Sequence, residues 1–224
     1  MTDENINIKL NEANMLLENK EFKKAIVILE EVNKIKENFE IKMNLGTCYK
    51  KMGDFENSLK FYEEASVLTD ANNEVFYNIG NLFYEQNKLE ESITYFDKSL
   101  KINSKHLDSI VNKSISLFAM KQFQKSLDLI LDIYDEDISN YKLNFLIAGN
   151  YMYLHKWKDA IPYVKKGLEI KPNDKPLRNI LGVVYRQLGL TNEGAKNIAF
   201  SDGVIVFHDN LDYYEIINDL EYKE

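Results

Sequence analysis

Apolar and small residues recur along this chain at the spacing of amphipathic helices, in short segments separated by polar turns. In residues 73–86 they fall three and four positions apart. The members of this stripe are Phe76, Ile79, Gly80 and Phe83. A second stripe follows the polar pair Asn87 and Lys88, and its members are Leu89, Ile93, Phe96 and Leu100. This spacing predicts two helices joined by a tight turn.

The same pattern returns every 34 residues, which indicates a repeat protein. One column of small residues has the members Gly46, Gly80, Ser114, Ala148 and Gly182. A second small column has the members Ser58, Ser92, Ser126, Ala160 and Gly194. A column of mostly large apolar residues has the members Tyr62, Phe96, Ile130, Val164 and Ile198. Residues 6–38 form an earlier copy that is one residue shorter, so the sequence predicts six copies of one helix pair.

Gly80 needs an explanation, because glycine in a helix costs about 1 kcal/mol relative to alanine. Its place in a column of small residues indicates a position where two helices approach closely. We therefore expect a larger side chain at Gly80 to force the paired helices apart.

These columns resemble the tetratricopeptide repeat, whose period is also 34 residues. The copy at 141–174 carries the resemblance best, through Ala148, Tyr151, Trp157, Ala160, Gly167 and Pro172. The resemblance implies an all-α fold, a right-handed α-solenoid of tandem helix-turn-helix repeats that forms a single domain over residues 1–224. The expected repeats are residues 6–38, 39–72, 73–106, 107–140, 141–174 and 175–208. Residues 209–224 have an amphipathic pattern, and we expect them to form a C-terminal capping helix.

The resemblance also implies a concave groove, lined by the first helix of each pair, that binds peptide segments of partner proteins. The sixth position of that helix is asparagine in four successive copies, namely Asn11, Asn44, Asn78 and Asn112. The ninth position adds Asn14 and Asn81. A carboxamide carries a donor and an acceptor, so it can pair with a backbone peptide group. Family members that hold peptide backbones are similar in using asparagine at the sixth position, so we expect these residues to bind an extended peptide.

Aromatic side chains accompany the asparagines and are candidates for pockets that anchor peptide side chains. They are Tyr77, Tyr84, Phe118 and Phe145. Two other interpretations stay open from the sequence. The aromatic residues could pack against neighbouring helices instead, and the asparagines could be solvated residues of a chain rich in Asn, Lys and Ile.

Charge excludes some classes of partner. The chain has 28 Lys and Arg against 36 Asp and Glu, a formal net charge of −8. The expected edge of the groove is acidic at Glu40, Glu74 and Asp108 before it becomes basic at Lys142. Nucleic acids and anionic membrane surfaces favour clustered Lys and Arg. We therefore expect neither nucleic acid nor membrane as a partner.

The chain also lacks the sequence features of secreted and membrane proteins. Its first ten residues, MTDENINIKL, have no basic segment followed by an apolar run, as a signal peptide would. No apolar run approaches the length that spans a membrane. The single cysteine, Cys48, leaves no internal disulfide and fits a reducing compartment. We expect a cytoplasmic protein.

Residues for catalysis, metal binding or cofactor binding do not gather in the sequence. His106, His155 and His208 share no short metal-ligand spacing with one another or with Cys48. The glycines occupy packing columns, and none belongs to a phosphate-binding loop after a strand. We expect no catalytic residue, no metal and no cofactor.

The sequence thus predicts an adaptor or scaffold that binds an extended peptide of a partner protein. The alternative is a structural subunit of a homo-oligomer or larger complex, using its convex face or its C-terminal tail. A homodimer through the C-terminal region belongs to this alternative.

Overall fold

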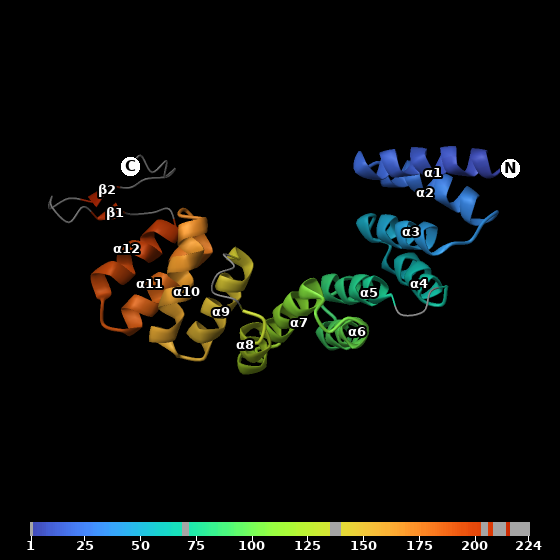
Figure 1. Ribbon diagram of the computed structural model, residues 1–224. Coiled ribbons are helices and arrows are strands. Elements are labelled where there is room, and N and C mark those ends of the chain that lie inside the picture. The colour runs from blue at the N-terminus through green and yellow to red at the C-terminus, as the bar shows by residue number, and fades with distance from the viewer. Residues whose placement is uncertain (1, 69–71, 135–139, 203–205, 208–213, 216–224) are drawn as a thin grey trace. The chain divides into compact units, whose positions relative to one another are not determined.

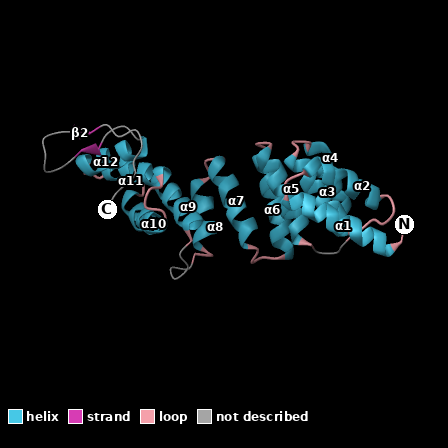
Figure 2. Ribbon diagram, turned by 90° about the horizontal axis from the view of Figure 1, so that it is seen from above, coloured by secondary structure: helices cyan, strands magenta, loops and turns pink. Residues whose placement is uncertain are grey.

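Helices form almost all of the described structure. The computed structural model describes residues 2–68, 72–134, 140–202, 206–207 and 214–215. Its helices are α1 (Asp3–Glu18), α2 (Phe22–Asn33), α3 (Phe39–Lys51), α4 (Phe55–Ser66), α5 (Asn73–Glu85), α6 (Leu89–Ile102), α7 (Leu107–Ala119), α8 (Phe123–Leu131), α9 (Tyr141–Tyr153), α10 (Trp157–Ile170), α11 (Lys175–Gln187) and α12 (Thr191–Asp202). Figures 1 and 2 show them as successive helix-turn-helix pairs. Each pair coincides with one expected repeat, apart from the first residues of α1. The predicted all-α fold of tandem helix-turn-helix repeats is confirmed.

The turn inside each pair contains one residue in the left-handed backbone region. The value of φ lies between 58° and 84° at Lys20, Gly53, Asn87, Lys121, His155 and Gly189. The next residue then donates its backbone N–H to a carbonyl in the last turn of the first helix, as Lys88 does to Phe83 at 2.9 Å. This bond terminates the first helix and reverses the chain. The six turns therefore share one geometry and produce six similar pairs.

The chain divides into two compact units, residues Met1–Ser116 and Leu117–Glu224, with the boundary inside α7. In the first unit each helix from α1 to α6 packs against the next. In the second unit each helix from α8 to α12 does the same, and α9 also contacts α11. Each unit has its own apolar core. That residues 1–224 form a single domain stays a prediction.

The small columns are the positions of closest approach between paired helices. A Cβ atom built on Gly80 would lie 2.6 Å from Cε1 of Phe96, and one on Gly46 would lie 2.6 Å from the Tyr62 ring. Both rings have no exposed surface, so neither has room to move away. Nearby, the Ser58 hydroxyl donates to the carbonyl of Gly46 at 2.7 Å. The predicted packing role of Gly80 is confirmed.

The C-terminal tail departs from the prediction. Strand β1 (Val206–Phe207) pairs antiparallel with β2 (Tyr214–Glu215), so that Val206 faces Glu215 and Phe207 faces Tyr214. The capping helix expected over 209–224 is therefore wrong at Tyr214–Glu215. Valine, phenylalanine and tyrosine favour a pleated strand, and the pairing satisfies that preference. The rest of that range lies outside the described residues.

Gly80→Ala should destabilise the first unit although alanine is the better helix former. The added methyl group overlaps the buried Phe96 ring, and overpacking of this kind costs about 1–3 kcal/mol. Urea unfolding followed by circular dichroism measures the change. Phe96→Leu in the Gly80→Ala background should recover part of the loss, because the smaller side chain makes room. An increase in the free energy of unfolding for Gly80→Ala alone would contradict this packing.

The phenol of Tyr62 is buried in the same interface. Its hydroxyl lies 3.0 Å from Oγ1 of Thr47, and the side chain has no exposed surface. Burial raises the pKa of Tyr62 to about 12, because the phenolate would lose its hydration. The folded state thus favours the neutral phenol. This contribution to stability is complete below the unfolded pKa of about 10 and is lost as the pH rises through 12.

Alkaline pH should therefore destabilise the wild type more than Tyr62→Phe. At pH 11 the wild type should have lost about 1 kcal/mol more of its free energy of unfolding than the variant, each relative to its own value at pH 8. Tyr62→Phe lacks the hydroxyl at every pH, so the loss of its hydrogen bond shifts the plot of unfolding free energy against pH by a constant amount. Urea unfolding at several pH values separates the two effects. Parallel curves for the two proteins would show that Tyr62 does not titrate as described.

Candidate functional site

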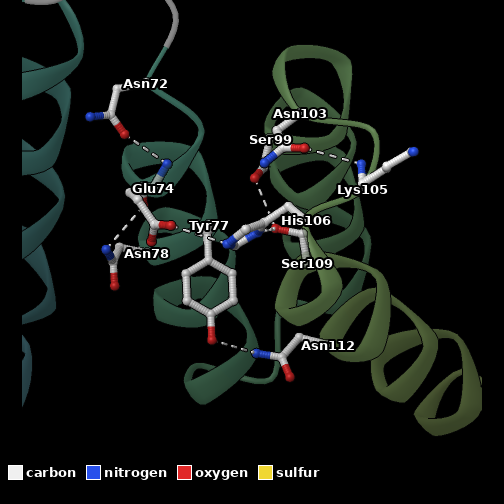
Figure 3. A network of polar contacts seen from close by, with 10 residues as sticks. All are labelled: Asn72, Glu74, Tyr77, Asn78, Ser99, Asn103, Lys105, His106, Ser109 and Asn112. Atoms are coloured by element: carbon white, nitrogen blue, oxygen red, sulfur yellow. Dashed lines mark hydrogen bonds and ion pairs between the residues drawn. The ribbon is translucent and has the colours of Figure 1, made fainter. Parts of the chain in front are cut away.

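Asparagines of the first unit join neighbouring first helices. Asn112 on α7 donates through Nδ2 to Oδ1 of Asn81 on α5 at 2.7 Å and to the hydroxyl of Tyr77 at 3.3 Å. All three residues are half-buried. Figure 3 shows the Tyr77–Asn112 contact between the two helices. Asn112 thus positions α5 and α7 relative to each other as well as presenting a polar group.

The same arrangement occurs between α1 and α3. Asn44 donates through Nδ2 to Oδ1 of Asn14 across 3.4 Å, which is long for such a bond. In both pairs a sixth-position asparagine meets the ninth-position asparagine of the preceding repeat. The structure therefore brings together four of the predicted asparagines as two pairs. Asn11 is exposed and makes no side-chain hydrogen bond within the described part of the chain.

Asn78 behaves differently from its counterparts. Its Nδ2 donates to the carbonyl of Glu74, one turn earlier on the same helix, at 3.0 Å (Figure 3). The ninth position of the preceding repeat is Thr47, whose hydroxyl pairs with Tyr62. Asn78 therefore has no asparagine partner on α3, and its carboxamide folds back on its own helix.

A polar network around His106 lies beside Tyr77 and was not predicted. Nε2 of His106 lies 3.1 Å from Oε1 of Glu74, and Nδ1 lies 2.7 Å from Oγ of Ser109. The Ser109 hydroxyl in turn lies 2.8 Å from Oγ of Ser99. The imidazole also meets the Tyr77 ring edge to face, with centroids 5.2 Å apart. Figure 3 shows how this network joins α5, α6 and the start of α7.

The sequence did hold a signal for His106. It occupies the position just before a first helix, where the corresponding residues are Asn38, Asn72, Asn140 and Asp174. Each of those side chains accepts a backbone N–H of its helix and caps it. His106 interrupts this column and instead contacts the Ser109 side chain. A break in a capping column thus marks a residue with a tertiary role.

The network contains a serine, a histidine and a carboxylate, the residue types of a serine hydrolase site. The burial of its serine argues for a structural role instead. Ser109 has no exposed surface, so its hydroxyl cannot meet a substrate in this conformation.

Cys48 is also fully buried, and burial raises the pKa of its thiol to about 11, which keeps it protonated at neutral pH. Among the described residues no group of His, Cys, Asp and Glu could hold a metal ion, and no helix is long and apolar enough to cross a membrane.

The predicted aromatic residues divide between packing and exposure. Tyr77 packs against the rings of Phe96 and His106, so the packing interpretation applies to it. Tyr84 is 39% exposed on the same helix. Phe118 and Phe145 lie in the second unit, where both line a hollow of about 270 Å³. These are the two predicted aromatic residues that line this pocket.

That pocket is formed mainly by the first helices α9 and α11. Its lining consists of Phe118, Phe145, Leu146, Gly149, Met152, Tyr153, Pro176, Asn179 and Ile180. Phe118 meets Tyr153 edge to face at 5.4 Å, which fixes one wall. The small Gly149 leaves room beside Phe118, since an added Cβ would lie 3.3 Å from that ring. Seven of the lining residues were not among the predicted site residues, because no single repeat contains the pocket.

Comparison with known proteins supports the conclusion that this chain is a helical repeat protein. Residues 39–66 and residues 74–106 match the tetratricopeptide repeat family. A TPR repeat-containing protein of Methanocaldococcus jannaschii is 23% identical over 184 residues, which cover 77% of this chain and 32% of that protein. The chain thus spans about a third of the length of this curated relative.

Solved structures share the same fold at low sequence identity. PilF of Pseudomonas aeruginosa superposes with a TM-score of 0.73 at 13% identity, covering 87% of this chain and 89% of that one. YrrB, described as a TPR protein with an unusual peptide-binding site, gives a TM-score of 0.62 at 15% identity, covering 75% and 88%. The helix pairs and their packing define an α-helical repeat protein. The predicted resemblance to the tetratricopeptide repeat family is confirmed by the matches at residues 39–66 and 74–106, and members of that family generally act as non-catalytic scaffolds for protein interactions.

Asn112→Ala should lower the free energy of unfolding by about 0.5–1.5 kcal/mol, because the hydrogen bonds that join α5 to α7 are lost. Asn81→Ala should have a smaller effect, and the double variant should cost less than the sum of the two, because both remove the same bond. Urea unfolding of the three variants measures this coupling. Asn11→Ala, at an exposed position of α1, is the control and should stay within about 0.5 kcal/mol of the wild type. Strictly additive effects would mean that the Asn81–Asn112 bond contributes nothing in solution.

Proposed function

We propose that this protein is an interaction adaptor that binds an extended peptide of a partner protein on the face formed by its first helices. The observation that carries the proposal is the pairing of asparagines from successive first helices, Asn14 with Asn44 and Asn81 with Asn112. Pairing orients each carboxamide before a ligand arrives. Binding then costs less conformational entropy than it would with free side chains.

The pair Asn14–Asn44 leaves suitable groups for a peptide backbone. Asn44 uses one amide hydrogen to reach Oδ1 of Asn14. Within the described chain, the amide hydrogens of Asn14 and Oδ1 of Asn44 have no other partner. One pair therefore offers donors on one helix and an acceptor on the next. A peptide group presents a carbonyl and an N–H that match this arrangement.

The spacing of the helices suits an extended chain. Packed helices lie about 8–10 Å apart, and an extended peptide advances about 3.3 Å per residue. Successive first helices would therefore meet about every third residue of the ligand. Contacts to the backbone fix position and direction, and side-chain pockets then determine which sequence is preferred.

Known relatives support this type of function only in general terms. Tetratricopeptide repeat proteins generally mediate protein interactions, and YrrB is described as having a peptide-binding site. Self-association through the C-terminal region stays a prediction, because residues 208–213 and 216–224 lie outside the described structure.

The test is the double variant Asn44→Ala/Asn78→Ala against peptides derived from the proteome of the source organism. These two side chains contribute little to the fold, since one makes a long hydrogen bond and the other bonds only its own helix. We expect peptide affinity to fall about tenfold, for the loss of roughly 1.4 kcal/mol of hydrogen bonding. The free energy of unfolding should change by no more than about 0.5 kcal/mol.

The matched control is Asn5→Ala/Asn57→Ala, which removes two carboxamides elsewhere in the first unit. The Asn57 carboxamide donates to Asp54, the N-cap of α4, so the stability of the control variant is measured as well as its affinity. The control should bind peptides as the wild type does. Equal affinity of the wild type and the Asn44→Ala/Asn78→Ala variant would rule out the asparagines as the peptide-binding groups.

A further inference from the structure

The pocket of the second unit has the size and lining of a receptor for a side chain. Its volume of about 270 Å³ lies below the range of about 300–1,000 Å³ found for drug-sized ligands. Phe118, Phe145 and Met152 supply apolar walls, and Asn179 is a polar group at the N-terminal part of α11. Such a hollow fits one or two apolar side chains and is too small for a large cofactor.

The two helices that supply most of this pocket, α9 and α11, carry charge of one sign. Helix α9 has the sequence YKLNFLIAGNYMY and α11 has the sequence KPLRNILGVVYRQ, and neither contains an acidic residue. Their cationic residues are Lys142, Lys175, Arg178 and Arg186. By contrast, α5 of the first unit carries Glu74 and Glu85 and no Lys or Arg. The basic character is thus a local property of the second unit in a chain whose net charge is −8.

Three of these cations lie on the same helix faces as residues that line the pocket. Lys142 lies one turn before Phe145 and Leu146, and Lys175 lies one turn before Asn179. Arg186 follows Asn179 by two turns and is exposed, as is Lys175. Arg178 donates to the carbonyl of Pro172 and to Asn197, and Lys142 also has a partner within the chain. The carboxylate of Asp174, just before α11, accepts from the hydroxyl of Tyr141 and caps α11.

We propose that this pocket binds a large apolar side chain of a partner segment whose neighbouring residues are Asp and Glu. The apolar walls take the side chain, while the exposed Lys175 and Arg186 attract the flanking carboxylates. An apolar pocket favours a peptide over a nucleic acid, because a phosphate backbone would leave that surface unfilled. This inference rests on the proposed peptide-binding function and specifies the chemistry of the partner.

The test is a selection of random twelve-residue peptides, displayed on phage, against the full chain. Enriched peptides are then synthesised with a fluorophore, and their affinities are measured by anisotropy at low and high salt. We expect enrichment of Leu, Ile, Met or Phe with at least two neighbouring Asp or Glu. Affinity should fall as salt rises, because the ion pairs lie at the exposed edge of the pocket.

Two variants separate the charge from the pocket. Lys175→Glu/Arg186→Glu should weaken the selected peptides about tenfold or more. Its matched control is Lys158→Glu/Lys165→Glu on α10, which makes the same change of charge at two exposed lysines and should weaken them less than about twofold. Met152→Gln places a polar group at the half-buried wall and should also weaken binding, while circular dichroism confirms that each variant is folded.

The outcomes distinguish this inference from the proposed function. Selected peptides without acidic residues, or peptides that respond to Asn44→Ala/Asn78→Ala and to neither pocket variant, would overturn the acidic-segment proposal and leave peptide binding intact. If no peptide is enriched, both proposals fail. A single-stranded oligouridine probe that binds the wild type and is lost with Lys175→Glu/Arg186→Glu would also overturn the inference, in favour of an RNA site.

Discussion

A close contact between a glycine on one helix and a buried ring on its partner determines the geometry of two helix pairs, α3–α4 and α5–α6. Gly80 faces Phe96, and Gly46 faces Tyr62, with no space for a Cβ atom. Because the rings are fully buried, the distance between the two helices of a pair is fixed by this contact. The left-handed turn residue then sets where the second helix begins. The left-handed turn residue is common to all of the pairs, whereas the glycine–ring contact belongs to α3–α4 and α5–α6.

Because successive helix pairs are alike, residues that recur with the period of the sequence lie on the same side of neighbouring first helices. The sixth position of one first helix becomes a neighbour of the ninth position of the preceding first helix, as the pairs Asn14–Asn44 and Asn81–Asn112 illustrate. A substitution in one repeat then alters one place on that surface without disturbing the others. At the next interface the ninth position is Thr47, so Asn78 turns back to the Glu74 carbonyl. The side chains that these helices present therefore vary from repeat to repeat, while the backbone geometry stays the same.

Periodic features could be predicted from the sequence, and features that break the period could not. The helix pairs, the packing role of Gly80 and the alignment of the asparagines follow from columns of similar residues. The His106 network depends on one residue that replaces Asn or Asp in a capping column. The pocket around Gly149 depends on residues from three helices. The strands at Val206–Phe207 and Tyr214–Glu215 lie beyond the regular repeats, where an amphipathic pattern alone did not determine the structure.

The same backbone can thus present two different surfaces within one chain. In the first unit, half-buried carboxamides are oriented by each other and suit the invariant groups of a peptide backbone. In the second unit, α9 and α11 lack acidic residues and enclose an apolar hollow, which suits a particular side chain and its charged neighbours. A contact to the backbone contributes affinity without selectivity, whereas an apolar pocket beside cations discriminates between sequences. If the proposed function holds, selectivity should reside in the second unit, because its pocket would contact side chains of the partner while the asparagines would contact its backbone.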